Sequence, residues 1–138
     1  MKKSTKILIT VVMLISVVVG AFLISYMRSV QHYQNAVANI SYENENASKI
    51  PDGTYIGECD VQFIYAKVEV TVKNGVIENI KLLEHRNKKG ASAERIVNKI
   101  MEQQCIDVDA VSGATNSSKV IKKAVDNALS NARTGKNQ

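Results

Sequence analysis

A long apolar run near the N-terminus is the first hydrophobic pattern along the chain. Apart from Thr10, Ser16 and Gly20, every position from Ile7 to Ile24 is apolar, and no position in the run is charged. At 1.5 Å per residue, a helix of this length spans roughly 27 Å, which is close to the hydrocarbon thickness of a bilayer. The run therefore predicts one helix that crosses a membrane once.

The charges around this run predict its orientation. Lys2, Lys3 and Lys6 precede it, and lysines beside a membrane helix favour the cytoplasmic side. We therefore expect residues 1–28 to be a membrane anchor and the chain after Arg28 to be extracytoplasmic. A cleaved signal peptide is the alternative, but its apolar region is usually shorter and an Ala-x-Ala-like site is missing here. An uncleaved anchor is the favoured interpretation.

A change of composition marks where the folded part begins. Residues 29–50 are polar and show no sustained apolar period, which is typical of a stalk or tether. Pro51-Asp52-Gly53 then gives a turn signal. We predict a polar stalk over residues 29–50 and one folded domain over residues 51–138, the length of an ordinary small domain.

Strict alternation of apolar and polar residues follows in the first half of this domain. Residues 54–59 are a short strand candidate, and from position 66 to position 73 apolar residues alternate with polar ones. That period of two predicts a strand with one buried face. Asn74-Gly75 is the preferred pair for a tight hairpin turn, so residues 76–84 are expected to return as the partner strand.

Helical spacing replaces alternation in the second half. After a basic loop at residues 86–90, the apolar residues predict a helix over 92–104. A second apolar stripe runs from Val120 to Leu129, with Lys122, Lys123 and Asp126 outside it. Strands followed by amphipathic helices predict an α+β fold, in which a small antiparallel sheet carries two helices packed on one face. One N-terminal transmembrane helix precedes this domain.

Composition and charge argue against some classes of function. Hydrophobic residues make up 45% of the chain and aromatic residues only 5%, so the core is expected to be aliphatic. The net charge of +5 is spread along the chain and forms no basic stripe with aromatic residues, which argues against nucleic-acid binding. Cys59 and Cys105 have no Cys-x-x-Cys spacing, so no metal site is predicted, and a disulfide between them stays open.

The segment between the two predicted helices is dense in small and hydroxyl-bearing residues. It reads Asp107-Val108-Asp109-Ala110-Val111-Ser112-Gly113-Ala114-Thr115-Asn116-Ser117-Ser118. One interpretation is a helix cap alone, because Ser, Thr and Asn are good N-caps and Gly permits a tight turn. The other is a phosphate site, because a helix N-terminus offers free N–H groups and a favourable dipole. The residues alone leave both open.

Part of this segment also resembles a motif of a known protein family. The run Asp109-Ala110-Val111-Ser112-Gly113-Ala114-Thr115 resembles the acceptor motif Asp-x-x-(Ser/Thr)-Gly-Ala-(Thr/Ser) of the FMN-binding domain family. That family includes the flavinylated C subunit of sodium-pumping NADH:quinone reductase and the G subunit of the Rnf complex. The similarity extends from Asp52-Gly53-Thr54-Tyr55 through Leu83-Glu84-His85 to residues 124–129.

The resemblance implies roles for the motif residues. Thr115 would accept flavin mononucleotide (FMN) through a phosphoester bond made by a separate flavin transferase that uses FAD and magnesium. Ser112, Gly113 and Ala114 would shape the loop and contact the phosphate, and Asp109 would hold the loop or serve recognition by the transferase. The N–H groups from Asn116 onwards could stabilise the remaining charge. Candidate neighbours of the isoalloxazine ring are Tyr55, Tyr65 and His85, although aromatic strand residues usually pack within the sheet.

The implied function is electron transfer by a membrane-anchored, extracytoplasmic flavoprotein. Its redox partner would be linked to membrane quinone or would be another redox subunit, and the flavin would supply the chemistry. No residue pair resembles a substrate-reducing catalytic site, so no catalytic residue is assigned and a carrier is favoured over an enzyme. The alternatives are a non-redox FMN-binding or sensing module and a structural domain without flavin.

Overall fold

The computed structural model describes residues 2–43, 47–87 and 91–135. Parts of the predicted stalk (44–46) and of the predicted basic loop (88–90) therefore lie outside the described residues. The chain divides into two compact units, residues 1–35 and residues 36–138.

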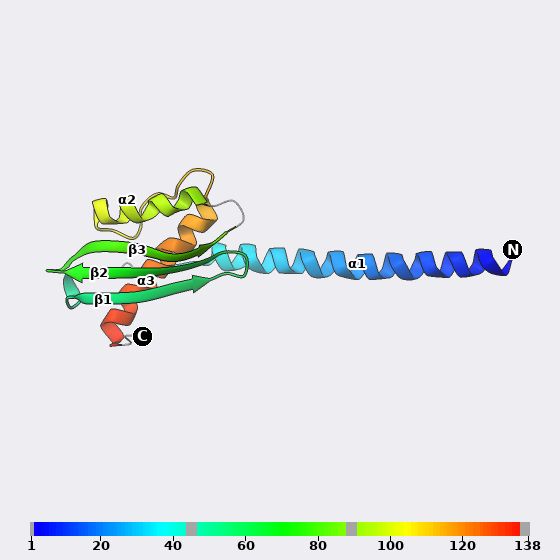
Figure 1. Cartoon of the computed structure of the whole chain (residues 1–138), viewed down its shortest axis with the longest axis horizontal. Coiled ribbons are helices and arrows are strands. Elements are labelled where there is room, and N and C mark those ends of the chain that lie inside the picture. The colour runs from blue at the N-terminus through cyan, green and yellow to red at the C-terminus, as the bar shows by residue number, and fades with distance from the viewer. Residues whose placement is uncertain (1, 44–46, 88–90, 136–138) are drawn as a thin grey trace. The chain divides into compact units, whose positions relative to one another are not determined.

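Most of the helix α1 (Lys3–Ala38) lies in the first unit (Figure 1). Its large apolar side chains are exposed, with Met13 at 67% and Phe22 at 71%. Among the described residues it is the one helix long and apolar enough to cross a membrane, as the sequence predicted. The helix continues to Ala38, into the segment predicted as a stalk, because no residue between Arg28 and Ala38 breaks it.

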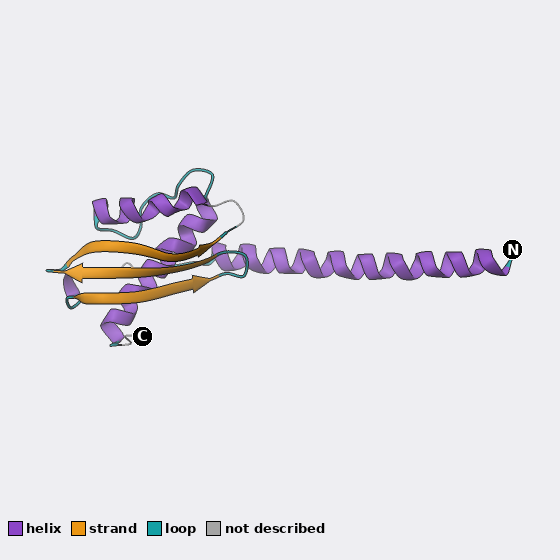
Figure 2. Cartoon of the chain, viewed as in Figure 1, coloured by secondary structure: helices purple, strands orange, loops and turns teal. Residues whose placement is uncertain are grey.

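Three antiparallel strands make the sheet of the second unit, in the order β1-β2-β3 (Figure 2). They are β1 (Gly53–Asp60), β2 (Tyr65–Lys73) and β3 (Val76–Arg86). In β2 the alternating residues Ala66, Val68, Val70 and Val72 are at most 1% exposed. The opposite face of this central strand is polar and half-buried, so one face of the sheet holds the core.

The hairpin between β2 and β3 has the turn that the sequence predicted. Asn74 and Gly75 both have positive φ, at 52° and 74°, as a type I′ turn requires. The Asn74 N–H also donates to the Asp52 carboxylate at 2.8 Å, which ties the turn to the start of β1.

The helices cover the buried face of the sheet, and the predicted α+β fold is confirmed. A 3₁₀ turn, η2 (Ala91–Arg95), leads into α2 (Ile96–Gln103), which packs along β3. The helix predicted over 92–104 thus begins as 3₁₀, with Ala93 fully buried in that turn. Helix α3 (Thr115–Thr134) packs across β1 and β2 (Figure 1).

Contacts of α3 with the edge strand β1 are unusually close. A Cβ added to Gly57 would lie 2.1 Å from the Ala124 carbonyl oxygen and 2.3 Å from the Ala128 nitrogen. The side-chain amides of Asn127 and Asn131 donate to the Glu58 and Ile56 carbonyls of β1, at 2.8 and 3.0 Å. These bonds occupy the free edge of the sheet, which could otherwise pair with another chain.

The second unit begins before the boundary at residue 51 that the sequence predicted. Val37, Ala47 and Ile50 are buried in it, with Ala47 in the short 3₁₀ turn η1 (Ala47–Lys49). These apolar residues are isolated in a polar segment and show no periodic pattern in the sequence, yet each is buried in the core. Cys59 and Cys105 are both free.

Candidate functional site

The segment before α3 forms a tight turn. The Ala114 N–H donates to the Val111 carbonyl at 3.0 Å, which closes the turn around Ser112 and Gly113. Gly113 has a φ of 76°, a conformation that other residues adopt only with strain. An added Cβ there would meet nothing within 4 Å. Gly113 is therefore needed for backbone conformation, and its surroundings are open to an approaching molecule.

Helix α3 begins without a side-chain cap. Its N-cap residue is Ala114, which has no side-chain oxygen and therefore makes no side-chain cap hydrogen bond. The first helical bond runs from the Ser118 N–H to the Ala114 carbonyl at 2.9 Å. The N–H groups of Thr115 and Ser117 precede this bond or lie in the same turn and have no acceptor within the helix. The interpretation of this segment as a helix cap alone loses its support, since the hydroxyl residues do not cap.

Thr115 is the first residue of α3, and its side chain is exposed. Within the described part of the chain, its hydroxyl makes no hydrogen bond. A hydroxyl in this position is accessible to another macromolecule and is not held by an internal contact.

The other predicted site residues lie around Thr115 on the same surface loop. Asp109, Ser112, Gly113 and Asn116 are exposed, whereas Ala114 is buried. Ser112 and Gly113 lie in the turn, Ala114 closes it, and Thr115 and Asn116 begin α3, whereas Asp109 lies two residues before the turn.

Two residues that the sequence analysis did not single out make hydrogen bonds to the backbone of the segment before α3. The Ser118 hydroxyl is fully buried and accepts a hydrogen bond from the Val111 N–H at 3.0 Å. Lys99 of α2 donates to the Asp109 carbonyl at 3.3 Å. Ser118 could have been suspected from its place in the hydroxyl-rich segment, but the Lys99 contact joins separate elements and leaves no sequence signal.

Lys122 is a third such residue. It was placed outside the apolar stripe of α3, yet it is only 5% exposed. Its ammonium donates to the Val108 carbonyl at 2.8 Å and to the Asp107 carboxylate at 3.4 Å. The Tyr42 ring covers it, with its centroid 4.6 Å from Nζ.

Asp126, also outside the stripe, is fully buried. Lys123 donates to its carboxylate at 2.7 Å, and the Glu43 N–H lies 3.1 Å from both carboxylate oxygens. Lys122 and Asp126 are buried because the segment after α1 covers this side of α3. Burial, with Asp107 adding to it, raises the pKa of Tyr42 to about 12.

The three candidate neighbours of a flavin ring lie in different places. Tyr55 is buried and donates to the Pro51 carbonyl at 2.8 Å, as a structural residue does. Tyr65 donates to Glu58 at 2.8 Å, which raises its pKa, and its ring lies under Arg86 on the open face of the sheet.

His85 differs from both because a bulge in the sheet turns it inward. The register of β2 and β3 shifts between Lys67 and Val68, so that His85 pairs with Ala66 on the buried face. Its side chain is 2% exposed, and Nδ1 lies 3.2 Å from Glu94. Nε2 is buried and has no hydrogen-bond partner among the described residues.

His85 lies at the same end of the sheet as the N-terminus of α3. Asn131 contacts Ile56 and Asn127 contacts Glu58, so the N-terminal direction of α3 leads toward the C-terminal end of β1. In an antiparallel sheet that end is also where β3 finishes, and His85 is next to last in β3. Of the three candidates, His85 has the position and the unsatisfied atom that suit a ligand.

No group of three or more His, Cys, Asp or Glu side chains converges on a metal-sized site within the residues described. Burial raises the pKa of the Cys59 thiol, which lowers its reactivity.

Comparison with known families identifies one match. Residues 65–130 match the family model described as the FMN-binding domain. The matched segment runs from the start of β2 into α3 and includes the whole turn before Thr115. No curated protein matches this chain.

Proposed function

Residues 65–130 belong to the FMN-binding domain family, and from this premise we propose that the protein carries FMN covalently on the Thr115 hydroxyl. The observation that carries the proposal is the exposed, unbonded Thr115 hydroxyl at an uncapped helix N-terminus inside the matched segment. A phosphate held there would meet the N–H groups of Thr115 and Ser117 and the positive end of the helix dipole.

Attachment would follow from FAD in the active site of a separate flavin transferase with magnesium. The Thr115 oxygen forms a bond to the phosphorus of the FMN half, the pyrophosphate bond breaks, and AMP leaves. The hydroxyl proton passes to a base of the transferase. The open surroundings of Gly113 support this proposal, because the transferase must reach the backbone of the turn closely.

The residues present fit such a group. The uncapped first turn suits the phosphodiester, and the buried Nε2 of His85 supplies an unused polar atom for the ring. We assign His85 as a ring neighbour, with Ser112, Ala114 and Asp109 shaping the loop. The flavin absorption spectrum tests the assignment of His85. The His85→Leu variant should show shifted flavin bands, and an unshifted spectrum from a folded variant would exclude His85 as a ring neighbour.

The bound flavin supplies reversible redox chemistry, and the protein supplies position and tuning. We propose that the protein acts as an electron carrier, which receives electrons from a quinone-linked or other redox partner. The apolar helix α1 supports membrane anchoring, and the lysines before it support an extracytoplasmic domain. A non-redox FMN-binding or sensing module is the alternative, and it requires flavin that stays bound without a covalent link.

The deciding experiment is the intact mass of the full chain after co-expression with a flavin transferase. We expect an increase of one FMN less water in the wild type and none in Thr115→Ala, with in-gel flavin fluorescence following the mass. Thr134→Ala, at the other exposed end of the same helix, is the matched control and should be flavinylated. An adduct in Thr115→Ala would refute the assignment, and flavin bound without any adduct would favour the alternative.

A further inference from the structure

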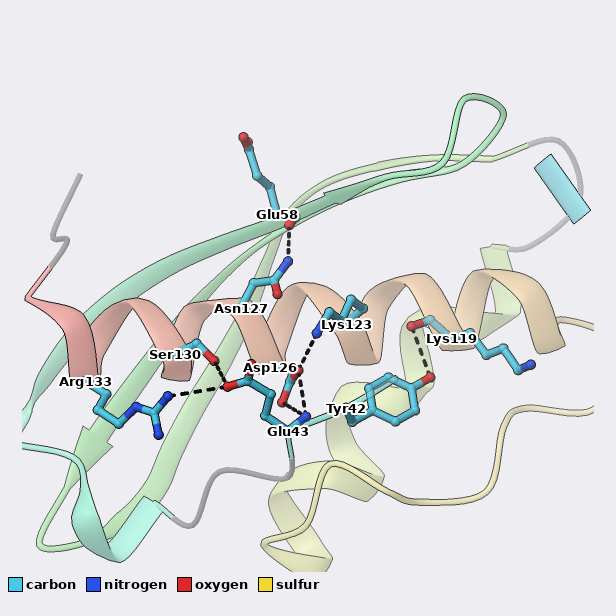
Figure 3. Close-up of polar contacts among 9 residues, drawn as sticks. All are labelled: Tyr42, Glu43, Glu58, Lys119, Lys123, Asp126, Asn127, Ser130 and Arg133. Carbon is cyan, nitrogen blue, oxygen red and sulfur yellow. Dashed lines mark hydrogen bonds and ion pairs between the residues drawn. The ribbon is translucent and has the colours of Figure 1, made fainter. Parts of the chain in front are cut away.

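The segment that follows α1 contacts α3 through two consecutive residues, Tyr42 and Glu43 (Figure 3). We call these two residues the α3 clamp. The Glu43 N–H bonds the buried Asp126 carboxylate, and the Tyr42 hydroxyl donates to the Lys119 carbonyl at 3.4 Å. The Glu43 carboxylate reaches further along the helix, where Ser130 and Arg133 lie at 3.2 and 3.6 Å.

The two residues of the clamp act on different ends of α3. Among the described residues, the Glu43 carboxylate contacts the C-terminal half of α3, at Ser130 and Arg133. The Tyr42 ring instead covers the Lys122 ammonium, which holds the Val108 carbonyl. Val108 lies in the segment that leads into the turn before Thr115. A continuous series of contacts therefore joins Tyr42 to the flavin-acceptor turn.

The position of the Lys122 ammonium depends on the Tyr42 ring that covers it. A buried ammonium is stable only when its charge is compensated, and here a carbonyl, a carboxylate and an aromatic face surround it. The Asp107 side chain is 64% exposed and is the weaker of the two oxygen partners. Without the ring, water would reach Nζ and compete with the Val108 carbonyl.

We propose that Tyr42 is a positioning residue for covalent flavin attachment: by covering Lys122 it fixes Val108 and with it the turn that presents Thr115. This inference rests on the proposed function. It assigns to the membrane-proximal segment a part in flavinylation, although that segment lies outside the residues that match the FMN-binding family.

The test is the single-turnover rate of flavinylation of the full chain by a flavin transferase, with thermal unfolding measured beside it. Tyr42→Leu removes the ring and should slow attachment by about fivefold, the factor that a cation–π contact of moderate strength represents. Tyr42→Phe keeps the ring and should restore the wild-type rate. Lys122→Met should slow attachment similarly, and the double variant Tyr42→Leu/Lys122→Met should be no slower than Lys122→Met alone.

Glu43→Gln is the matched control, because its side chain contacts α3 far from the acceptor turn and its N–H still reaches Asp126. It should flavinylate at the wild-type rate. Equal rates in Tyr42→Leu and wild type, or equal slowing in Glu43→Gln, would overturn the inference while leaving Thr115 as the acceptor. If Tyr42→Leu does not fold, Tyr42→Met keeps the packing volume and takes its place. A wild type without any adduct would instead refute the proposed function.

Discussion

Ser118 connects the turn before Thr115 to the interior of the domain. Its buried hydroxyl is the acceptor for the Val111 N–H. Loss of this acceptor leaves a buried N–H without a partner, which costs about 1–3 kcal/mol.

We expect Ser118→Ala to lower the free energy of unfolding by that amount, measured by urea denaturation of the full chain in detergent. Ser130→Ala removes a hydroxyl that donates to Glu43 at the exposed surface, and it should cost at most about 0.5 kcal/mol. Equal stability of Ser118→Ala and the wild type would mean that water or another group satisfies Val111.

Tyr42 makes the stability of the domain depend on alkaline pH. Its folded-state pKa is about 12, above the ordinary value of 10, chiefly because of burial. Between these values the unfolded chain has released the phenol proton while the folded chain keeps it, so the folded state loses stability as pH rises.

The difference in unfolding free energy between the wild type and Tyr42→Phe should therefore shift against the wild type from pH 10 to pH 12. Below pH 10 the difference should be constant. Comparing the two proteins cancels the titration of the lysines and the other tyrosines. A difference that does not change with pH would show that the Tyr42 phenol is solvated in the folded state.

At the scale of elements, the packing of α3 on β1 depends on one missing side chain. Any Cβ at Gly57 would collide with the backbone of α3 at Ala124 and Ala128, and a backbone cannot move aside as a flexible side chain can. The helix would have to shift away from the sheet along its whole contact.

Gly57→Ala should lower the free energy of unfolding by about 3 kcal/mol, at the upper end of the usual cost of overpacking. Gly53→Ala in the same strand is the control, because the atoms nearest to its added Cβ belong to the Tyr55 side chain, with the hydroxyl oxygen at 2.9 Å, and not to the backbone. Thermal unfolding followed by tyrosine absorbance would compare them. Similar midpoints for the two variants would contradict the close approach of α3.

The elements that the sequence predicted well are those whose signals are local. The alternation in β2, the Asn74-Gly75 turn and the stripe of α3 each depend on near neighbours. The hydroxyl and glycine residues before α3 indicated a turn or cap, whereas the prediction of a flavin acceptor came from the resemblance to a family. The inward turn of His85 depends instead on a bulge, which shifts register without a sequence mark. The burial of Lys122 depends on Tyr42, 80 positions away in the chain, and no local pattern could predict it.

At the scale of the whole molecule, the side of the membrane on which the domain lies decides its redox partners. The lysines before α1 predict an extracytoplasmic domain. A covalent link suits that location, because a flavin released there would diffuse away. Labelling of the two free cysteines, which differ in exposure, can show on which side of the membrane the domain lies.

Cys105 is exposed, whereas Cys59 is half-buried and its pKa is raised by burial, so a maleimide should react with Cys105 first. In a Cys59→Ser variant, a membrane-impermeant maleimide added to intact cells should label the chain if the domain is extracytoplasmic. A Lys3→Cys substitution in a chain whose native cysteines are both replaced by Ser provides the internal control, which should be labelled only after permeabilisation. The reverse pattern would place the domain in the cytoplasm and exclude an extracytoplasmic electron carrier, while leaving flavin attachment at Thr115 to its own test.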